Sequence, residues 1–399
     1  MRKPSAWYRA SFLALALVVT AAAAPATAAP YRPQSDAQVL DTLPQRPGDA
    51  RWRELRALRQ ALAADPRNAD KAAALAGRYI TDAMASGDPR GAGRAQAVLA
   101  PWWNHAEPPP EVRVARATVL QYGHQFDAAR ADLLAALAQQ PDSAEAWAWL
   151  AAISLVRADL AQARQACQRL AALAPPLVGA ACLAQVDSLG GEPSAAATAL
   201  RQALLADREA DAEQRLWALT RLAEAEQRQG RLDAAEAAYR QALVLRDDDA
   251  YLLAAYADLL LDQGRPADAL KLLKDRQRAD ALLLRAAIAA QALGTPEAAR
   301  WRAELAARFE AAAQRGDALH QKEEARFALV LQGDAPRALQ LAAQNFKLQR
   351  EPSDARLLLE AALAAKQPDA AAPALDWMRD TGHRDPVLDK LAAAAKAPR

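Results

Sequence analysis

The sequence predicts an all-α protein in which antiparallel helix pairs stack into a solenoid. The first observation is a repeat, because the same order of small, large and proline residues returns after 34 residues, from Pro141 to Pro175. The second is the composition: aromatic residues make up 5% of the chain and it has 15 glycines, while alanine and leucine, which favour helix, dominate. These features predict helix-turn-helix units almost throughout.

Each unit is expected to consist of a first helix, helix A, and a second helix, helix B. Small residues on both helices let neighbours approach closely, and larger residues between them fill the gaps. Proline ends helix B because it lacks an N–H donor and clashes with the preceding turn. A single pair cannot bury its apolar face, so adjacent pairs must stack. In two successive units the order is Ala129, Leu133, Ala136, Pro141 and then Ala163, Cys167, Ala171, Pro175.

The N-terminus has the layout of a secretory signal peptide. Three basic residues precede an uncharged run over residues 11–24, and small residues follow up to Ala28. We expect residues 1–28 to be removed after Ala28, because cleavage one residue later would leave Pro30 at the new N-terminus. A retained membrane anchor is the alternative, which the short, alanine-rich apolar run disfavours.

Removal of this segment leaves a nearly neutral chain. The full sequence has 50 Lys+Arg and 48 Asp+Glu, and residues 1–28 hold three of the basic residues and no acidic ones, so the mature net charge is about −1. This balance argues against nucleic acid or an anionic membrane surface as the main partner. No other segment is long and apolar enough to span a bilayer, and we expect a periplasmic protein.

Residues 29–50 are expected to be an extended leader because they contain four prolines among polar residues. A divergent helical repeat follows over residues 51–107. Its first helix begins near Arg51, and Pro108-Pro109-Pro110 ends the repeat because this run cannot lie inside a helix. The helices expected within this repeat continue over residues 70–86 and from about residue 94 to Trp102-Trp103.

The core array is expected over residues 111–276. Residues 126–139 give a strong helix B, and the unit over 216–247 fits the pattern best, with Leu222 and Ala223 before Gly230. The remaining units are expected at residues 144–175, 177–207 and 250–276.

From residue 277 the pattern loosens into divergent C-terminal repeats and a cap that end at residue 396. The segment over 297–315 is expected to be an overlong helix B. The other helices are expected at residues 281–294, 318–333, 336–349, 353–366 and 371–379, with a capping helix at 385–396.

These residues resemble the tetratricopeptide repeat (TPR) superfamily, and in particular exported bacterial TPR proteins without a catalytic domain. The resemblance covers most of residues 51–395 and is strongest over 124–276. It implies a right-handed superhelix whose helix-A faces line a concave groove for a peptide or protein. The glycine that usually follows leucine in helix A is replaced by Ala151, Ala184, Ala223 and Ala257.

The repeat register identifies the helix-A positions that should face the groove. They mix aromatic residues with both charge signs, and each could instead be solvated helix surface. They lack the Lys/Asn/Lys/Arg pattern by which some TPR proteins bind a C-terminal carboxylate. The candidates are Gln121, Tyr122, Trp149, Trp217, Arg221, Glu224, Tyr251, Asp258, Arg285, His320 and Glu324.

The two cysteines are expected to lie level with each other on antiparallel helices. Cys167 falls in a helix B and Cys182 in the next helix A, each about 10–12 Å from the turn between them at 1.5 Å per residue. A structural disulfide is the expected state in an oxidising compartment, provided that both side chains face one seam. Two buried free thiols and a redox pair are the alternatives.

No recognisable motif for catalysis or cofactor binding is found. The histidines lack ligand spacing, and there is no phosphate loop, dinucleotide fingerprint or nucleophile elbow, so no metal or cofactor is expected. Asp247-Asp248-Asp249 is expected to cap a helix, with a calcium site as the alternative. The cluster at Trp102-Trp103-Asn104-His105 is expected to pack between repeats, with an aromatic ligand contact as the alternative.

The leading hypothesis is a non-catalytic periplasmic scaffold that binds a protein or peptide in its groove. Within the binding class, the alternative is a scaffold for envelope polysaccharide or outer-membrane assembly machinery. From another class, the alternative is an enzyme whose site lies in the irregular C-terminal third, where Lys322-Glu323-Glu324 is found. A pocket with convergent, pKa-perturbed carboxylates would favour the enzyme, and a continued helix stack would favour the scaffold.

Overall fold

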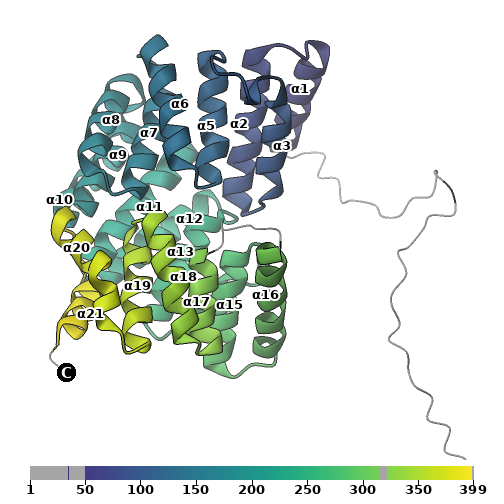
Figure 1. Ribbon diagram of the computed structural model, residues 1–399. Coiled ribbons are helices and arrows are strands. Elements are labelled where there is room, and N and C mark those ends of the chain that lie inside the picture. The colour runs from purple at the N-terminus through teal and green to yellow at the C-terminus, as the bar shows by residue number, and fades with distance from the viewer. Residues whose placement is uncertain (1–34, 36–49, 315–320, 398–399) are drawn as a thin grey trace, which may run out of the picture. The chain divides into compact units, whose positions relative to one another are not determined.

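The computed structural model describes Ser35 and residues 50–314 and 321–397. The predicted signal peptide, nearly all of the leader and His320 lie outside the described residues. From Ala50 onward the chain forms one compact unit, and its described residues form helices and no strand (Figure 1). The predicted all-α solenoid of stacked antiparallel helix pairs is confirmed.

The first helices build the divergent N-terminal repeat and its connection to the array. They are α1 (Ala50–Ala64), α2 (Ala69–Ser86), α3 (Arg90–Val98) and the single turn α4 (Ala100–Trp103). Five regular pairs follow: α5 (Pro110–Tyr122) with α6 (Phe126–Gln139), α7 (Ala144–Val156) with α8 (Leu160–Leu173), α9 (Pro176–Leu189) with α10 (Pro193–Ala206), α11 (Ala212–Arg228) with α12 (Leu232–Leu245), and α13 (Ala250–Asp262) with α14 (Pro266–Leu272).

The C-terminal third continues as helix pairs with irregular segments. Its elements are α15 (Asp280–Leu293), α16 (Glu297–Gln314), α17 (Gln321–Phe327), a π-helix η1 (Ala328–Gln332), α18 (Ala335–Leu348), α19 (Pro352–Ala364), a 3₁₀ turn η2 (Pro368–Ala371), α20 (Ala372–Thr381) and α21 (Pro386–Lys396). The α-helix expected up to Gly333 therefore changes to π geometry at Ala328. It ends at Gly333 with φ 69°, a left-handed conformation that glycine adopts without strain.

The close approach of the helices depends on the small residues of the repeat. Ala129, Ala163, Ala196, Ala235 and Ala269 stand at one helix-B position of successive repeats, and each is completely buried. The four alanines that replace glycine in helix A are also buried, with at most 1% exposed. A larger side chain at these positions would force neighbouring helices apart.

The turn from helix A to helix B repeats one backbone feature. Two residues before helix B, the chain has a positive φ, which is +68° at Gly264 and +72° at Gly230. His124, Ala158 and Lys366 occupy the same place with φ of 56–61°, where a side chain is strained. Aspartates cap several of the following helices; the Asp159 carboxylate, for example, accepts the backbone N–H of Gln162 at 3.0 Å.

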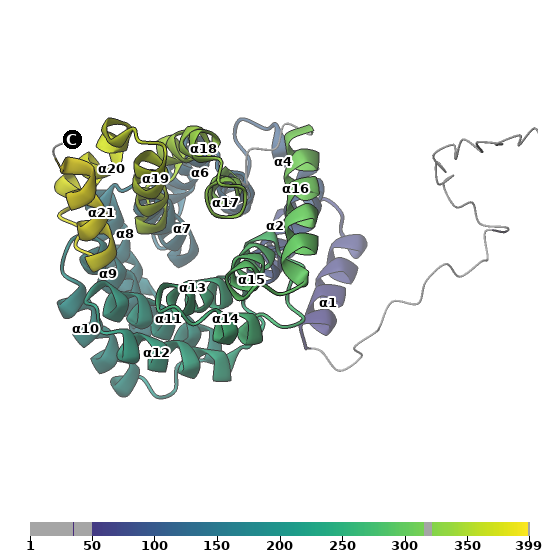
Figure 2. The same cartoon turned by 90° about the horizontal axis from the view of Figure 1, so that it is seen from below.

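Regular stacking is interrupted between α16 and α17. In the core array each helix B packs closely on the helix A that follows, but the backbones of α16 and α17 hardly approach each other and the two helices meet mainly through side chains such as Phe309 and Phe327. Beyond this point, α17–α21 turn back toward the helix-A side of earlier repeats (Figures 1 and 2). The backbone N–H of Arg350 donates to the carbonyl of Val156 at 2.8 Å, so the two segments touch directly.

Candidate functional site

The concave face is built by the helix-A side chains of successive repeats. Five of the predicted groove residues form two adjoining polar clusters on α11, α13 and α15. One contains Arg221, Glu224 and Tyr251, and the other contains Asp258 and Arg285. Because these positions come from three successive repeats, the groove register brings them onto one face.

The first cluster surrounds Tyr251. Its hydroxyl donates to a carboxylate oxygen of Glu224 at 2.6 Å, and the Arg221 guanidinium lies 4.8 Å from its ring centroid. Arg221 also pairs with Glu224 at 3.0 Å. Arg221 and Glu224 are therefore already partnered within the chain.

Tyr251 is half-exposed to solvent, while its hydroxyl is held by a protein carboxylate. Half of the residue, 50%, is accessible to solvent, yet burial raises the pKa of its hydroxyl and the nearby charge of Glu351 adds to the rise. The exposed fraction shows that solvent reaches the Tyr251 side chain.

The second cluster joins the core array to the C-terminal third. Asp258 on α13 accepts from Arg285 on α15 at 2.6 Å and from Arg326 on α17 at 2.7 Å. Burial alone would raise the pKa of Asp258, but the two guanidinium groups outweigh it and lower the pKa to about 2. Asp258 is thus a fixed anion that ties α15 and α17 to α13.

A third cluster, which the groove register did not predict, comes from α17 and α19. The Lys322 ammonium lies 3.1 Å from Asp354 and 3.8 Å from Glu351. Burial lowers the pKa of Lys322, but the two carboxylates outweigh it and raise the pKa overall, while burial raises the pKa of Glu351. Its only sequence signal was the charged run that begins at Lys322. Its approach to the concave face depends on the fold-back of the chain, which brings α17 to α13 through Arg326 and Asp258.

The other predicted groove residues lie elsewhere. Glu324 pairs with Arg337 on α18, which removes it from the Tyr251 and Asp258 clusters. Trp149 and Trp217 are half-buried and pack on the cores of the neighbouring repeats. Gln121 and Tyr122 are half-buried on α5, and Tyr122 packs on the N-terminal core.

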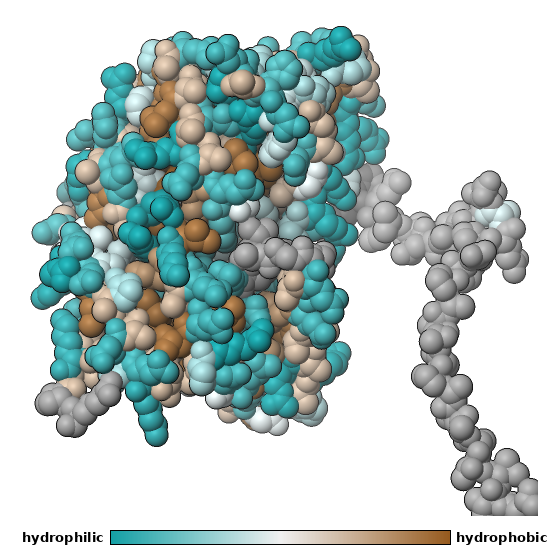
Figure 3. Space-filling view, viewed as in Figure 1, coloured by the Kyte–Doolittle hydropathy of each residue, from teal (hydrophilic) through white to brown (hydrophobic). Residues whose placement is uncertain are grey.

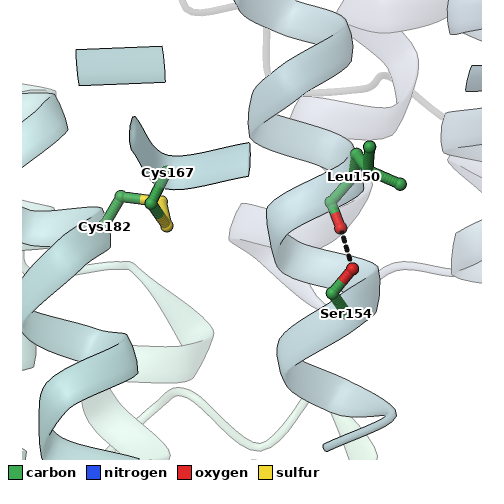
Figure 4. Close-up of a disulfide and its surroundings, with 4 residues drawn as sticks. All are labelled: Leu150, Ser154, Cys167 and Cys182. Carbon is green, nitrogen blue, oxygen red and sulfur yellow. Dashed lines mark hydrogen bonds between the residues drawn. A yellow bond between two sulfur atoms is a disulfide. The ribbon is translucent and has the colours of Figure 1, made fainter. Parts of the chain in front are cut away.

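The cysteines form a disulfide between α8 and α9 (Figure 4). Their Cα atoms are 5.4 Å apart, and both side chains are buried, Cys167 completely and Cys182 with 3% exposed. The two helices are antiparallel neighbours, so the bond joins one repeat to the next. This geometry gives the disulfide a structural position inside the core.

The tryptophans before the proline run take part in repeat packing. Trp102 and Trp103 lie half-buried against the N-terminal core. The carbonyl of Trp103 accepts from Arg116 at 2.7 Å, and Arg116 also holds both oxygens of Asp132 at 2.6 Å. Arg116 therefore joins the end of the first repeat to α5 and α6.

The acidic run at residues 247–249 is divided among three contacts. Asp249 caps α13, Asp247 pairs with Arg276 at 3.0 Å, and Asp248 pairs with Arg51 at 3.1 Å. Among the residues that the structure describes, no group of three or more His, Cys, Asp or Glu side chains could hold a metal ion.

Two cavities lie away from Glu351 and Asp258. A cavity of about 350 Å³ opens where α16 separates from α17 and η1, and alanines, Phe327, Leu331, Arg302 and Gln332 line it. A second, of about 220 Å³, lies between the start of α6 and the turn from α7 to α8. Glu351 and Asp258 line neither, so a pocket with convergent perturbed carboxylates is not found at either cavity.

The visible surface is mostly hydrophilic, with apolar residues scattered over it (Figure 3). None of the helices in residues 50–314 and 321–397 has the length and apolar character needed to cross a membrane.

Comparisons with known proteins give similarity at the level of structure. No family model matches the sequence, and no curated protein matches it. The chain is similar to PilW, described as a widely conserved type IV pilus biogenesis factor, at 20% identity over 50% of this chain and 94% of PilW, with a TM-score of 0.40. It is also similar to a thermophilic TPR protein of Thermus thermophilus, TTC0263, at 24% identity over 46% of this chain and 98% of that chain, with a TM-score of 0.40.

A TPR protein from Parabacteroides merdae is 16% identical over 64% of this chain and 99% of its own, with a TM-score of 0.38. With TM-scores below 0.5, none of these similarities carries a partner or an activity over to this chain. The chain resembles TPR proteins, and this resemblance rests on its own helix pairs, their spacing and their buried alanines.

Proposed function

We propose that this protein is a non-catalytic scaffold that binds a protein or peptide on the concave face of its helix-A array. The observation that carries the proposal is the arrangement around Tyr251: a half-exposed aromatic ring with an arginine and a carboxylate beside it. Aromatic and arginine side chains are enriched where proteins bind one another, because they combine apolar area with directed hydrogen bonds.

The helix architecture supports binding rather than catalysis. Helix pairs fill the described residues of the C-terminal third, and Glu351, whose pKa burial raises, is paired there with Lys322 and lines neither of the two cavities described above. A rigid solenoid offers an extended surface on which a segment of a partner can lie. We also propose that the protein acts in the periplasm after cleavage behind Ala28, which the basic and apolar N-terminal segments support.

Site-specific crosslinking tests the binding face. We would place a photo-reactive benzoylphenylalanine at position 251 and, as the control, at position 244, where Val244 on helix B is 86% exposed. Crosslinking in intact cells is expected to give a discrete adduct from position 251 and none from position 244. Equal adducts from both positions would refute binding at this face.

Fractionation tests the compartment. The mature chain should begin at Ala29 and appear in the periplasmic fraction, which N-terminal sequencing and fractionation would measure. Recovery of a stable full-length chain that begins at Met1 would contradict the export proposal.

A further inference from the structure

The C-terminal helices have a hydrophobic core of their own. The buried residues of this core all fall between Ala325 and Leu388, and among the described residues of the earlier repeats only Ala158 packs on it. The cores of the earlier repeats form separate clusters. Residues 321–396, which form α17–α21, therefore bury most of their apolar side chains against one another, and we call them the gate.

Polar contacts hold much of the gate against the earlier repeats. Arg356 holds both carboxylate oxygens of Asp262 at 2.6 and 2.7 Å, and Arg157 donates to the carbonyls of Lys347 and Leu348, each at 3.2 Å. Partly exposed ion pairs contribute little net stability because water solvates the separated charges well. Polar contacts between units within a chain permit relative motion unless a large apolar surface joins them.

Apolar packing anchors one end of the gate. Phe327 and Leu331 belong to the core of α15 and α16, and the ring of Phe327 lies 5.4 Å from that of Phe309. The π-helix η1 lies at this anchor, beside the site where α16 separates from α17. Local π geometry is frequent at functional sites in helices.

The other end of the gate is a small latch. The turn at Gly382 packs directly on the turn at Gly191, so that a Cβ added at Gly191 would lie 2.2 Å from the Gly382 carbonyl oxygen. Beside it, His383 is 2% exposed and its Nδ1 lies 3.0 Å from the carbonyl oxygen of Leu189. Glycine is required at position 191 for this contact.

We propose that the gate closes over the concave face and that its release at the latch opens the groove. Between anchor and latch, Arg326 of the gate pairs with Asp258 of the groove at 2.7 Å. This groove side chain thus already faces the gate in this conformation. The gate is an autoinhibitory contact of the proposed binding face, and the inference rests on that proposed function.

A wedge at the latch tests this directly. Gly191→Ala introduces the clash with Gly382, whereas Gly264→Ala imposes a comparable strain at φ +68° in a turn with no neighbouring atom within 4 Å. Both would be made in the full chain with Tyr251→Cys, which provides a distinct free thiol because the native cysteines are joined to each other. A bulky polymer-linked maleimide reports whether the groove is open, and N-ethylmaleimide reports local reactivity.

Gly191→Ala should raise the rate at which the bulky maleimide labels the thiol at position 251 by about tenfold over the Gly264→Ala control, the order of a typical conformational coupling. The N-ethylmaleimide rate should be the same in both. Equal bulky labelling in the two proteins would overturn the gate.

A second, milder variant keeps the gate testable if circular dichroism shows that Gly191→Ala misfolds. Arg157→Ala with Arg356→Ala removes polar gate contacts without a clash and should also raise bulky labelling. If it leaves the rate unchanged, the gate is likewise overturned. The maleimide labelling needs no binding partner, so an unchanged labelling rate refutes the gate alone. The binding face is refuted separately, if a protein whose groove is shown to be open gives no crosslink from position 251.

Discussion

Acid should release the latch through His383. Burial of this side chain, assisted by the positive charge of Arg228, lowers the pKa of His383 to about 4 despite its hydrogen bond to the Leu189 carbonyl. Nδ1 donates to that carbonyl, so a second proton must go to Nε2, which is buried without a hydrogen-bond partner. The Trp377 ring, 4.9 Å away, covers the imidazole from α20.

The magnitude follows from the two pKa values. The ordinary pKa of histidine is 6.5 and the folded value is about 4, and each unit corresponds to about 1.4 kcal/mol. Because the folded pKa is depressed, neutral His383 contributes about 3 kcal/mol above pH 6.5. This contribution is lost progressively as the pH falls from 6.5 to about 4.

Urea unfolding across this range is the assay. We would compare wild-type protein with His383→Gln, whose amide can donate to Leu189 but does not titrate, from about pH 7 to about pH 4.5. Wild type should lose up to about 3 kcal/mol more than the variant over the full window. His105→Gln, at an exposed histidine, serves as the matched control and should follow wild type.

Parallel pH dependence of wild type and His383→Gln would refute this reasoning. Fluorescence of Trp377 would locate the change, since this ring contacts the imidazole.

Three further predictions concern stability. Replacing Cys167 and Cys182 together by alanine should lower the free energy of unfolding by about 3 kcal/mol, the value for a loop of about 15 residues, in urea titrations without reductant; an unchanged midpoint would argue against the bond. Lys366→Gly should stabilise by about 1 kcal/mol by relieving the strain at φ 56°, and a lower thermal midpoint would contradict this. Asp258→Asn should lower the free energy of unfolding by about 2 kcal/mol at neutral pH and by almost nothing near pH 2. The low pKa of Asp258 stabilises the fold above pH 3.8, and this stabilisation is lost as the pH falls to about 2. A loss of stability that does not depend on pH would refute the ion-pair account.

The clusters on the concave face were predictable only in part. Arg221, Glu224 and Tyr251 occupy groove positions in two successive regular repeats, so their proximity follows from the register and the local stacking. Glu324 shows where this reasoning ends, since it pairs with Arg337 instead of joining them. When the repeat register is continued into α17, it crosses the junction after α16, where stacking is interrupted. Beyond that junction the register no longer defines which side chain of α17 faces the groove.

The sequence by itself determined the helical class, the helix pairs and the buried alanines. These depend on residues a few turns apart, and a 34-residue period carries that information in local patterns of size and polarity. It also placed the two cysteines on facing helices, because they are separated by one short turn.

Only the tertiary structure decided that the C-terminal helices return to the concave face. The contacts that hold them join residues far apart in the chain, with Arg326 lying 68 positions from Asp258 and Arg157 lying 190 positions from Lys347. Their meeting depends on the rotation accumulated over many repeats and on the interruption between α16 and α17. Repeat periodicity describes each unit and its neighbour, and so it does not encode which distant turns come together.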